Sequence, residues 1–368
     1  MEINGIELAF FCAVLIQIIY WLVWLMGVTR LKKSTAIKNG NGISIVIAAN
    51  NELENLKHNL PKVLSQEYST YEVIVVDDRS SDESYEFLLE LAKQHKNLKV
   101  LTVTDLPDHL NGKKYAITLG IKTAKFDQIL LTDADCYPES KNWIGTFANA
   151  WGEKISFVVG FSQYKQRPGL LNYFIRFETL VTGIQYLASA ALNKPYMGVG
   201  RNLSYSKTMF LSKKGFHGYQ NLVGGDDDLF VNKHAIGANT QLVIGADALI
   251  TSYPKTSWST YFLQKTRHLS VGKHYTAKSK LILSVFSLTW IATWFLFPFL
   301  FFDPMNLLVS GSLLVLRIIL MGTTILVFLK RTETRLSILG LILLDIMFAL
   351  YYFVTGIKAL LAKRVKWK

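Results

Sequence analysis

The stretch Ile129-Leu-Leu-Thr-Asp-Ala-Asp-Cys-Tyr-Pro138 decides the fold that the sequence predicts. Its leading apolar run indicates a buried strand, and the acidic residues that follow then emerge at the edge of a sheet. Alternation along an extended chain points Asp133 and Asp135 to the same side. Two neighbouring carboxylates repel each other, so they favour a bound cation, and their hard oxygen ligands suit Mg²⁺ or Mn²⁺. The alternative is a solvated acidic turn without a metal.

The chain around this stretch predicts an α/β fold. Strands and helices alternate, with strands expected at 43–47, 73–76, 99–103 and 129–131 and helices at 52–66, 82–93 and 113–124. Such alternation is typical of a parallel sheet that is covered on both faces, and Asp82 is suited to cap the second helix. Ligands of these sheets bind at the carboxyl ends of the strands. Polar residues follow three of the strands, at 50–52, 77–80 and 133–135, and therefore predict a binding site.

The composition indicates a membrane-attached protein. Half of the 368 residues are hydrophobic, and the mean hydropathy is +0.24. Four apolar segments are long enough to cross a membrane as helices, at 8–28, 281–302, 305–329 and 336–361. The last two contain Arg317 and Asp345, and we expect these charges to face the interior of the helix bundle and to pair. A role of this pair in transport is the alternative.

The net charge of +13 is concentrated beside the apolar segments, at residues 30–33, 273–280, 330–331 and 363–368. Because positive flanks face the cytoplasm, the region after the first segment is expected there, at the inner membrane of a bacterium. Four crossings would place the basic tail at 363–368 outside, against this rule. The alternative is that one of the last segments is re-entrant or lies in the interface. No basic face interleaved with exposed aromatics is evident, so we expect no nucleic-acid partner.

These patterns divide the chain into a membrane anchor at 1–32, a soluble domain at 33–280 and membrane segments at 281–368. Within the soluble part, apolar residues at helical spacing predict a helix at 170–192 that packs in the core or lies on the membrane surface. An amphipathic interfacial helix is expected at 258–275. The two cysteines, Cys12 and Cys136, support neither a disulfide framework nor a zinc site.

Four motifs occur in a fixed order: Val75-Val-Asp-Asp-Arg-Ser-Ser-Asp82, Asp133-Ala-Asp135, Gly224-Gly-Asp-Asp-Asp-Leu229 and Gln264-Lys-Thr-Arg267. In this order they resemble the membrane-bound, inverting family-two glycosyltransferases of the GT-A fold, a branch that includes cellulose and hyaluronan synthases and ceramide glucosyltransferase. The resemblance covers roughly residues 43–274. It implies a Rossmann-like domain that binds a nucleotide sugar, with transmembrane helices on both sides, and a metal-dependent hexosyltransferase.

The resemblance also implies which residues bind the donor. The loop with Asn51 and Glu52, together with Asp77 or Asp78, would hold the base and ribose. Asp135 would bind the divalent metal, with Asp133 near the metal or the ribose. Lys113, which matches a Gly-Lys segment of the family, would lie near the nucleotide. The alternatives are a helix-capping turn at Asp77 and Asp78 and an ordinary charged helix start at Lys113.

Three adjacent acids, Asp226, Asp227 and Asp228, supply the candidate catalytic base. Inversion needs a carboxylate within reach of the acceptor hydroxyl, and neighbouring acids raise one another's proton affinity. The sequence favours Asp227 as the base, with Asp226 as the second choice. The alternative is that these acids only form the start of a helix. The resemblance makes Arg267 the clamp for the diphosphate and puts Gln264 near the acceptor. His268 stands where the family has a Trp of the acceptor site.

We therefore expect transfer of a hexose from a UDP-linked sugar to a lipid acceptor at the membrane, with inversion. The close alternative is a processive polysaccharide synthase that extends a glycan. More distant alternatives are a transport component with a nucleotide-binding domain and a nucleotide-sugar sensor without catalysis.

Overall fold

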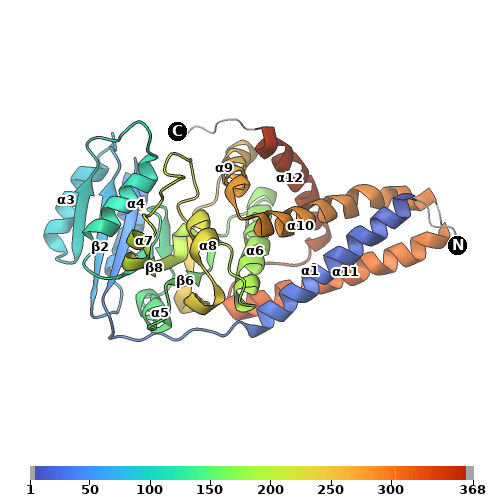
Figure 1. Cartoon of the computed structure of the whole chain (residues 1–368), viewed down its shortest axis with the longest axis horizontal. Helices are drawn as coiled ribbons and strands as arrows, with labels where there is room; N and C mark the ends of the chain where they lie inside the picture. The colour runs from blue at the N-terminus through green and yellow to red at the C-terminus, as the bar shows by residue number, and fades with distance from the viewer. Residues whose placement is uncertain (1–4, 303, 362–368) are drawn as a thin grey trace.

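The computed structural model describes residues 5–302 and 304–361 and places a mixed sheet at one end of the molecule and long apolar helices at the other (Figure 1). The sheet has the order β3-β2-β1-β4-β8-β6-β9. Its first four strands are parallel, β8 runs antiparallel to β4 and β6, and β9 is parallel to β6. The strands are β1 (Ile43–Ala49), β2 (Tyr71–Asp77), β3 (Leu98–Thr102), β4 (Gln128–Leu131), β6 (Phe157–Gly160), β8 (Leu203–Ser206) and β9 (Thr240–Val243).

Alternation along the parallel strands explains why both faces of the sheet carry helices. In β2, Val73 and Val75 pack with one hydrophobic core and Ile74 and Val76 with another. The first core holds apolar residues of α2 (Leu53–Leu64), α3 (Ser84–Gln94) and α5 (Trp143–Ala150), and the second those of α4 (Gly112–Thr123). The predicted α/β fold class is confirmed, and its strands and helices lie where the apolar runs indicate.

Asp82 acts near two helix starts rather than as the N-cap of one. Its carboxylate accepts hydrogen bonds from the backbone N–H of Ser84 at 3.1 Å and of Leu53 at 3.2 Å, which are the first residues of α3 and α2. The N-cap position of α3 itself is occupied by Glu83. One carboxylate therefore satisfies donors at the starts of both helices and fixes the loops after β1 and β2.

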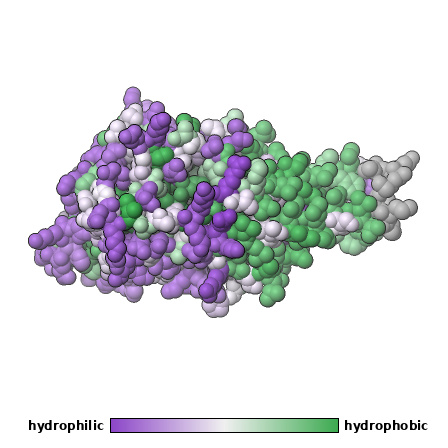
Figure 2. All heavy atoms as spheres, turned by 90° about the horizontal axis from the view of Figure 1, so that it is seen from below, coloured by the Kyte–Doolittle hydropathy of each residue, from purple (hydrophilic) through white to green (hydrophobic). Residues whose placement is uncertain are grey.

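Four helices are long and apolar enough to cross a membrane, as the sequence predicts: α1 (Gly5–Arg30), α10 (Ala277–Leu296, continued by a short 3₁₀ turn), α11 (Pro304–Thr332) and α12 (Leu341–Leu361). Hydrophobic residues cover this end of the molecule, whereas the sheet end is hydrophilic (Figure 2). The predicted pairing of Arg317 with Asp345 is confirmed by an ion pair between fully buried side chains. Trp290 lies against the guanidinium, with the Arg317 Cζ atom 4.6 Å from the ring centre.

A layer of three helices separates the sheet from the apolar bundle. It consists of α6 (Leu170–Ala191), α9 (Trp258–Val271) and α12, which pack against one another. The apolar stripe of α6 is buried in the core, at Phe174, Phe177, Val181, Ile184 and Leu187. Figure 1 shows that α12 runs across the direction of α1, α10 and α11 instead of along it. The basic tail at 363–368 lies outside the described residues.

The remaining elements connect these layers. A small sheet of order β5-β10-β7 lies beside the large one, and short helices flank β8. Their bounds are β5 (Cys136–Pro138), β7 (Ser162–Tyr164), β10 (Ile250–Ser252), α7 (Lys207–Ser212) and α8 (Asp228–His234).

We predict that the Arg317–Asp345 pair holds the helix bundle together and has no part in transport. Arg317→Met alone leaves a buried carboxylate without its partner and should destabilise the fold by about 3–5 kcal/mol. The double change Arg317→Met with Asp345→Leu removes both charges and should recover most of that loss. Thermal unfolding of the detergent-solubilised protein measures both effects. A double variant that is no more stable than the single one contradicts the prediction.

Candidate functional site

A cavity of about 430 Å³ opens at the carboxyl ends of β1 and β4, where parallel α/β sheets bind their ligands. Most of the residues that the sequence predicts for the site line this cavity. They are Glu52, Asp78, Lys113, Asp133, Asp135, Asp226, Asp227, Asp228, Gln264, Arg267 and His268. Residues from six separate parts of the chain thus meet in one place.

Two predicted residues, Asn51 and Asp77, do not line the cavity. Asn51 adopts a left-handed backbone (φ 55°), and its side-chain oxygen accepts a hydrogen bond from the N–H of Ser81 at 2.7 Å. Asp77 is buried at the end of β2 and accepts from the N–H of Ser80 at 3.2 Å. Both side chains therefore shape the loop that carries Asp78.

Asp78 is the member of the Asp77–Asp78 pair that reaches the cavity. Its Oδ1 atom pairs with Arg79 Nε at 2.9 Å. Its other oxygen lies so close to Gly112, the first residue of α4, that a Cβ atom there would clash with it. A glycine at this position thus lets the start of α4 approach the carboxylate. Asp78 and α4 together form the end of the cavity next to β2.

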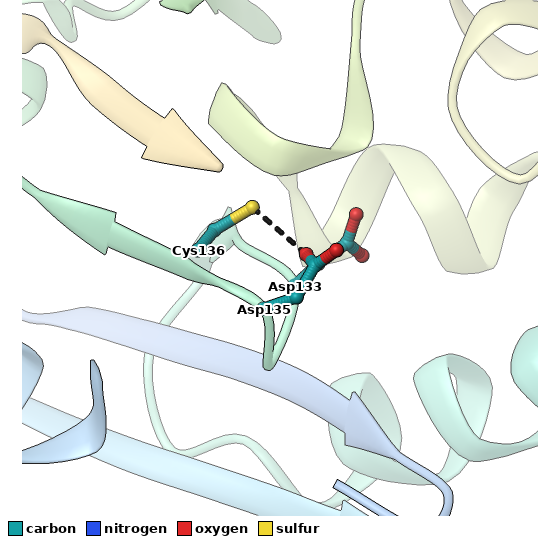
Figure 3. A group of neighbouring side chains, drawn as sticks. All are labelled: Asp133, Asp135 and Cys136. Carbon is teal, nitrogen blue, oxygen red and sulfur yellow. Dashed lines mark hydrogen bonds between the residues drawn. The ribbon is translucent and has the colours of Figure 1, made fainter. Parts of the chain in front are cut away.

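The Asp133–Asp135 motif forms a turn, not the extended segment that the sequence predicts. β4 ends at Leu131, and the Cys136 N–H donates to the Asp133 carbonyl oxygen at 3.1 Å, which closes the turn. The turn still brings the two carboxylates together: one ligand atom each of Asp133, Asp135 and Cys136 lie within 4.8 Å of one another (Figure 3). The convergence was predicted correctly and its backbone conformation was not.

The electrostatics of this turn fit a divalent cation. Burial and the neighbouring charge of Asp133 raise the pKa of Asp135, which means that its charged form is poorly compensated. Burial and Asp135 also raise the pKa of the Cys136 thiol well above its usual value, so the thiol stays protonated and donates to Asp135 Oδ1 at 3.1 Å. Two carboxylates are left as ligands, and oxygen ligands with room for others suit Mg²⁺ or Mn²⁺.

Lys113 connects the acidic turn with the acidic triad. Its Nζ atom lies 2.9 Å from Asp133 and 3.1 Å from Asp226. Burial alone would lower the pKa of this lysine, but the charges of Asp133, Asp226 and Asp227 outweigh it and raise the pKa well above its usual value. Lys113 is held in the first turn of α4, whose N-cap Asn111 accepts from the backbone of Lys114 at 3.3 Å. It therefore stays charged at the centre of the cavity.

Lys114 has a role that the sequence did not indicate. Its Nζ atom donates to the carbonyl oxygen of Leu222 at 2.6 Å and to that of Gly224. These bonds fix the chain just before the acidic triad, where Gly224 and Gly225 take left-handed backbone angles (φ 85° and 78°). Burial lowers the pKa of Lys114 to about 8. Lys113 and Lys114 thus act on the triad from two sides.

The three acids of the triad differ in their contacts. Asp227 accepts backbone N–H bonds on both oxygens, from Gly200 at 2.6 Å and from Asp228 at 2.7 Å. Asp228 accepts from Tyr275 Oη at 2.7 Å. Asp226 contacts the lysine in the cavity. These contacts divide the triad into one residue that faces Lys113 and two that are tied to the surrounding chain.

The triad also differs in proton affinity. Burial and neighbouring acids raise the pKa of Asp227 and, more strongly, of Asp228. For Asp226, burial is outweighed by Lys113 and Lys114, so its pKa is lowered. The expectation that all three acids raise one another's proton affinity is therefore wrong for Asp226, because two lysines lie beside it.

Helix α9 contributes Gln264, Arg267 and His268 to the opposite wall. Burial lowers the pKa of Arg267, and Asp226 and Asp133 act in the other direction. The ring of His268 is accessible from the cavity. Surrounding protein atoms and the charges of Lys265 and Arg267 nevertheless lower its pKa well below the usual value. His268 is therefore a neutral ring that can donate or accept one hydrogen bond.

Other cavity residues were missed because they belong to no pattern. Arg201, in the turn before β8, stacks over Tyr164 with its Cζ atom 4.6 Å from the ring centre and faces the charges of Asp133 and Asp135. The cavity also extends along α6, where Glu178 pairs with Lys265 at 2.5 Å. The only signal for Arg201 was the glycine-containing turn around it, and the only signal for Glu178 was a charge inside an apolar stripe.

Comparison with known proteins gives a family match that covers part of the region that builds this cavity. Residues 44–211 match the model of the Glycosyl transferase family 2. Two poly-beta-1,6-N-acetyl-D-glucosamine synthases of Staphylococcus epidermidis are 37% identical over 94 residues and 32% identical over 126 residues. These matches cover 26% and 32% of this chain, and only 22% and 29% of the two synthases. The chain therefore matches less than a third of the length of these relatives.

The structure is also similar to that of the mannosyltransferase PcManGT from Pyrobaculum calidifontis, which was determined in complex with GDP-Man and Mn²⁺. The TM-score is 0.61 at 17% sequence identity, and the match covers 99% of this chain and 100% of that one. At this identity the similarity extends to the fold alone.

We predict that Mn²⁺ binds at Asp133 and Asp135 and stabilises the folded protein. A ligand at a hundredfold excess over its Kd adds about 2.7 kcal/mol, which thermal unfolding detects as a higher Tm. Asp135→Asn removes both a ligand and the repulsion of Asp133. Without metal this variant should be at least as stable as the wild type, and Mn²⁺, alone or with UDP, should no longer raise its Tm. Glu54→Gln on α2 is the control. An equal Mn²⁺ shift in Asp135→Asn would exclude this site.

Proposed function

Since residues 44–211 match the model of the Glycosyl transferase family 2, we propose that this protein transfers a hexose from a UDP-linked sugar to a lipid acceptor, with inversion at the anomeric carbon. The observation that carries the proposal is the meeting of the acidic turn, Lys113, the acidic triad and α9 around one cavity. A nucleotide diphosphate sugar needs this combination: acceptors for the base and ribose, cations for the diphosphate and a carboxylate for the incoming hydroxyl.

The donor would extend from Asp78 toward α9. Asp78 and Glu52 offer oxygens to ring N–H or ribose hydroxyl groups. Asp133 and Asp135 would hold the divalent metal, which supplies charge stabilisation to the departing nucleoside diphosphate. Arg267 offers a planar fork of donors to the diphosphate, and Lys113 offers a point charge beside it.

We assign the general base to Asp226, with Asp227 in a positioning role, which reverses the order that the sequence favours. Asp226 is ionised, and its contact with Lys113 directs its carboxylate toward the acidic turn at Asp133 and Asp135. Asp227 uses both oxygens to fix the backbone of Gly200 and Asp228. When the diphosphate attracts Lys113, Asp226 becomes the carboxylate with an open lone pair for the acceptor hydroxyl.

The acceptor would approach along α6. Glu178, Thr179, Thr182 and Tyr186 line this arm of the cavity, and α6 belongs to the layer that borders the apolar bundle. The arm thus leads from the triad toward the membrane side of the molecule. A polar group attached to a lipid could enter it while its apolar chain stays beside α9 and α12. The ion pair of Glu178 with Lys265 and the neutral ring of His268 offer hydrogen bonds to such a group.

A processive polysaccharide synthase is the second candidate, because the Staphylococcus relatives are named as synthases of a polymer. A secreted polymer needs a channel, and the described chain has four helices that could cross a membrane. One of these, α12, belongs to the layer of three helices between the sheet and the apolar bundle. We therefore favour transfer of a single sugar over polymerisation.

We also propose that α1, α10 and α11 cross the membrane and that α12 lies along the cytoplasmic interface with the catalytic domain. α12 packs on α9, α6 and α10, and its exposed side is a continuous apolar face suited to lipid, at Ile342, Leu343, Ile346, Leu350 and Phe353. Three crossings leave the end of the chain in the cytoplasm. The basic residues at 363–368 then satisfy the positive-inside rule that four crossings violate.

The function is tested by incubating the purified protein and Mn²⁺ with a panel of nucleotide sugars and a membrane lipid extract. We expect one UDP-sugar to yield a lipid that carries one sugar of inverted anomeric configuration, as determined by mass spectrometry and NMR. A ladder of chain lengths would favour the synthase, and no transfer from any donor would contradict the proposal.

In the same assay, Asp226→Asn should lower kcat by about 10²–10⁴-fold, because it removes the base and keeps the shape. Its UDP–Mn²⁺ binding should stay within a fewfold of the wild type, which separates loss of chemistry from loss of the site. Asp227→Asn should lower Tm as well as activity. An Asp226→Asn enzyme with normal turnover would rule out this base.

The topology is tested with one added cysteine in a Cys12→Ser background, in which the remaining cysteine, Cys136, is buried. We expect a membrane-impermeant maleimide to label Lys358→Cys, near the end of α12, in inside-out membranes and not in intact cells. Lys57→Cys in the catalytic domain is the matched control and should behave in the same way. Labelling of Lys358→Cys in intact cells, with Lys57→Cys protected, would show that α12 crosses the membrane.

A further inference from the structure

A second cavity, of about 820 Å³, lies between the start of α6 and the connection from α11 to α12. Three arginines line it, Arg167, Arg176 and Arg335, and none of the described residues that line it is acidic. It contains no residue of the catalytic cavity. Three guanidinium groups without a carboxylate in one cavity favour an anion, and their planar forks suit phosphate oxygens in particular.

The walls of this cavity are held in place by hydrogen bonds between the two segments. Tyr173 on α6 donates to the Ser337 carbonyl oxygen at 2.5 Å, and Arg176 donates to the carbonyl oxygen of Arg335. On the other side, Asn172 accepts from the backbone N–H of Arg167 at 2.8 Å. The arginines are therefore carried by backbone segments that are fixed before any ligand binds.

Exposed apolar residues lie on both chain segments that build this cavity, and we call them its apolar rim: Leu170 lines the cavity, and Ile338 and Leu339 directly follow the lining residue Ser337. Leu339 is 98% exposed, Ile338 is 38% exposed, and both lie in the connection between two apolar helices. Leu170, at the start of α6, is 48% exposed on the facing wall. Side chains of this kind are stable in lipid and costly in water, so the rim points to a membrane surface. A free phosphate would use the arginines but leave this rim exposed.

We propose that this cavity binds the phosphate headgroup of an anionic phospholipid, with the acyl chains against Leu339, Ile338 and Leu170. The volume is sufficient for a glycerophosphate headgroup. Binding would anchor the start of α6 at the membrane surface, and α6 also lines the catalytic cavity. The site is defined by binding alone. Its test is therefore independent of the proposed transferase activity, and either proposal can fail without the other.

The test measures retention of phosphatidylglycerol and of phosphatidylcholine by native mass spectrometry of the full-length protein in detergent. We expect the wild type to retain phosphatidylglycerol and to retain phosphatidylcholine at least fivefold less. Arg167→Gln with Arg335→Gln should lower phosphatidylglycerol retention at least fivefold, because it removes two of the three cations and keeps Arg176, whose hydrogen bond supports the fold. Arg167 is an exposed residue, so Arg167→Gln alone should leave the fold intact. This single variant should lower phosphatidylglycerol retention at least twofold, and it keeps the test valid if the double variant unfolds.

The control is Lys57→Gln with Lys93→Gln, which removes two positive charges from α2 and α3, and it should retain phosphatidylglycerol as the wild type does. An equal loss in this control would mean that net charge, and not the cavity, binds the lipid. Equal retention of both lipids, or unchanged retention in the arginine variants, would overturn the site. Displacement of the lipid by millimolar glycerol 3-phosphate would overturn the role of the apolar rim and leave only a soluble phosphate site.

Discussion

The contact of Lys113 with both Asp133 and Asp226 is the constraint on which the cavity at the carboxyl ends of β1 and β4 depends. Acids from the end of β4 and from the loop before α8 converge there, and their mutual repulsion in a partly buried space opposes that convergence. The lysine, placed at the start of α4, compensates one acid of each group. A divalent cation would pair with the same carboxylates, and a diphosphate would pair with the same lysine. Binding then exchanges one set of ion pairs for another within a site that is already assembled.

The fold could be predicted from the sequence because its signals are local. The apolar runs that form β1, β2 and β4 predict the sheet, and polar residues that follow them line the cavity at its edge. Neighbouring side chains were harder to tell apart. Asp77 and Asp78 differ by one position, yet the first is the last residue of a buried strand and the second opens into the cavity. Only the register of the sheet decides which of them reaches a ligand.

Residues without a pattern could not be predicted at all. Lys114 and Arg201 belong to no recognisable motif, and their roles come from tertiary contacts with a loop and a ring that are distant in sequence. β4 ends at Leu131 as expected, but no propensity shows that the residues after it form a turn and not an extended segment. The orientation of α12 could not be predicted for a different reason. An apolar helix of this length has the same composition whether it crosses a membrane or lies along the membrane surface.

Helix α6 physically connects these parts. Its start borders the arginine cavity, its middle carries Glu178 in the catalytic cavity, and its end packs on α1, where a Cβ atom on Gly27 would lie 2.5 Å from the Ala188 carbonyl oxygen. The absence of a side chain at Gly27 thus allows close contact between the first apolar helix and the layer below the sheet. Because a packed helix moves as a unit, a lipid that holds its start also restrains the wall along which an acceptor would enter. If both proposals hold, α6 would link the position of the protein at the membrane to the shape of the arm through which the acceptor enters.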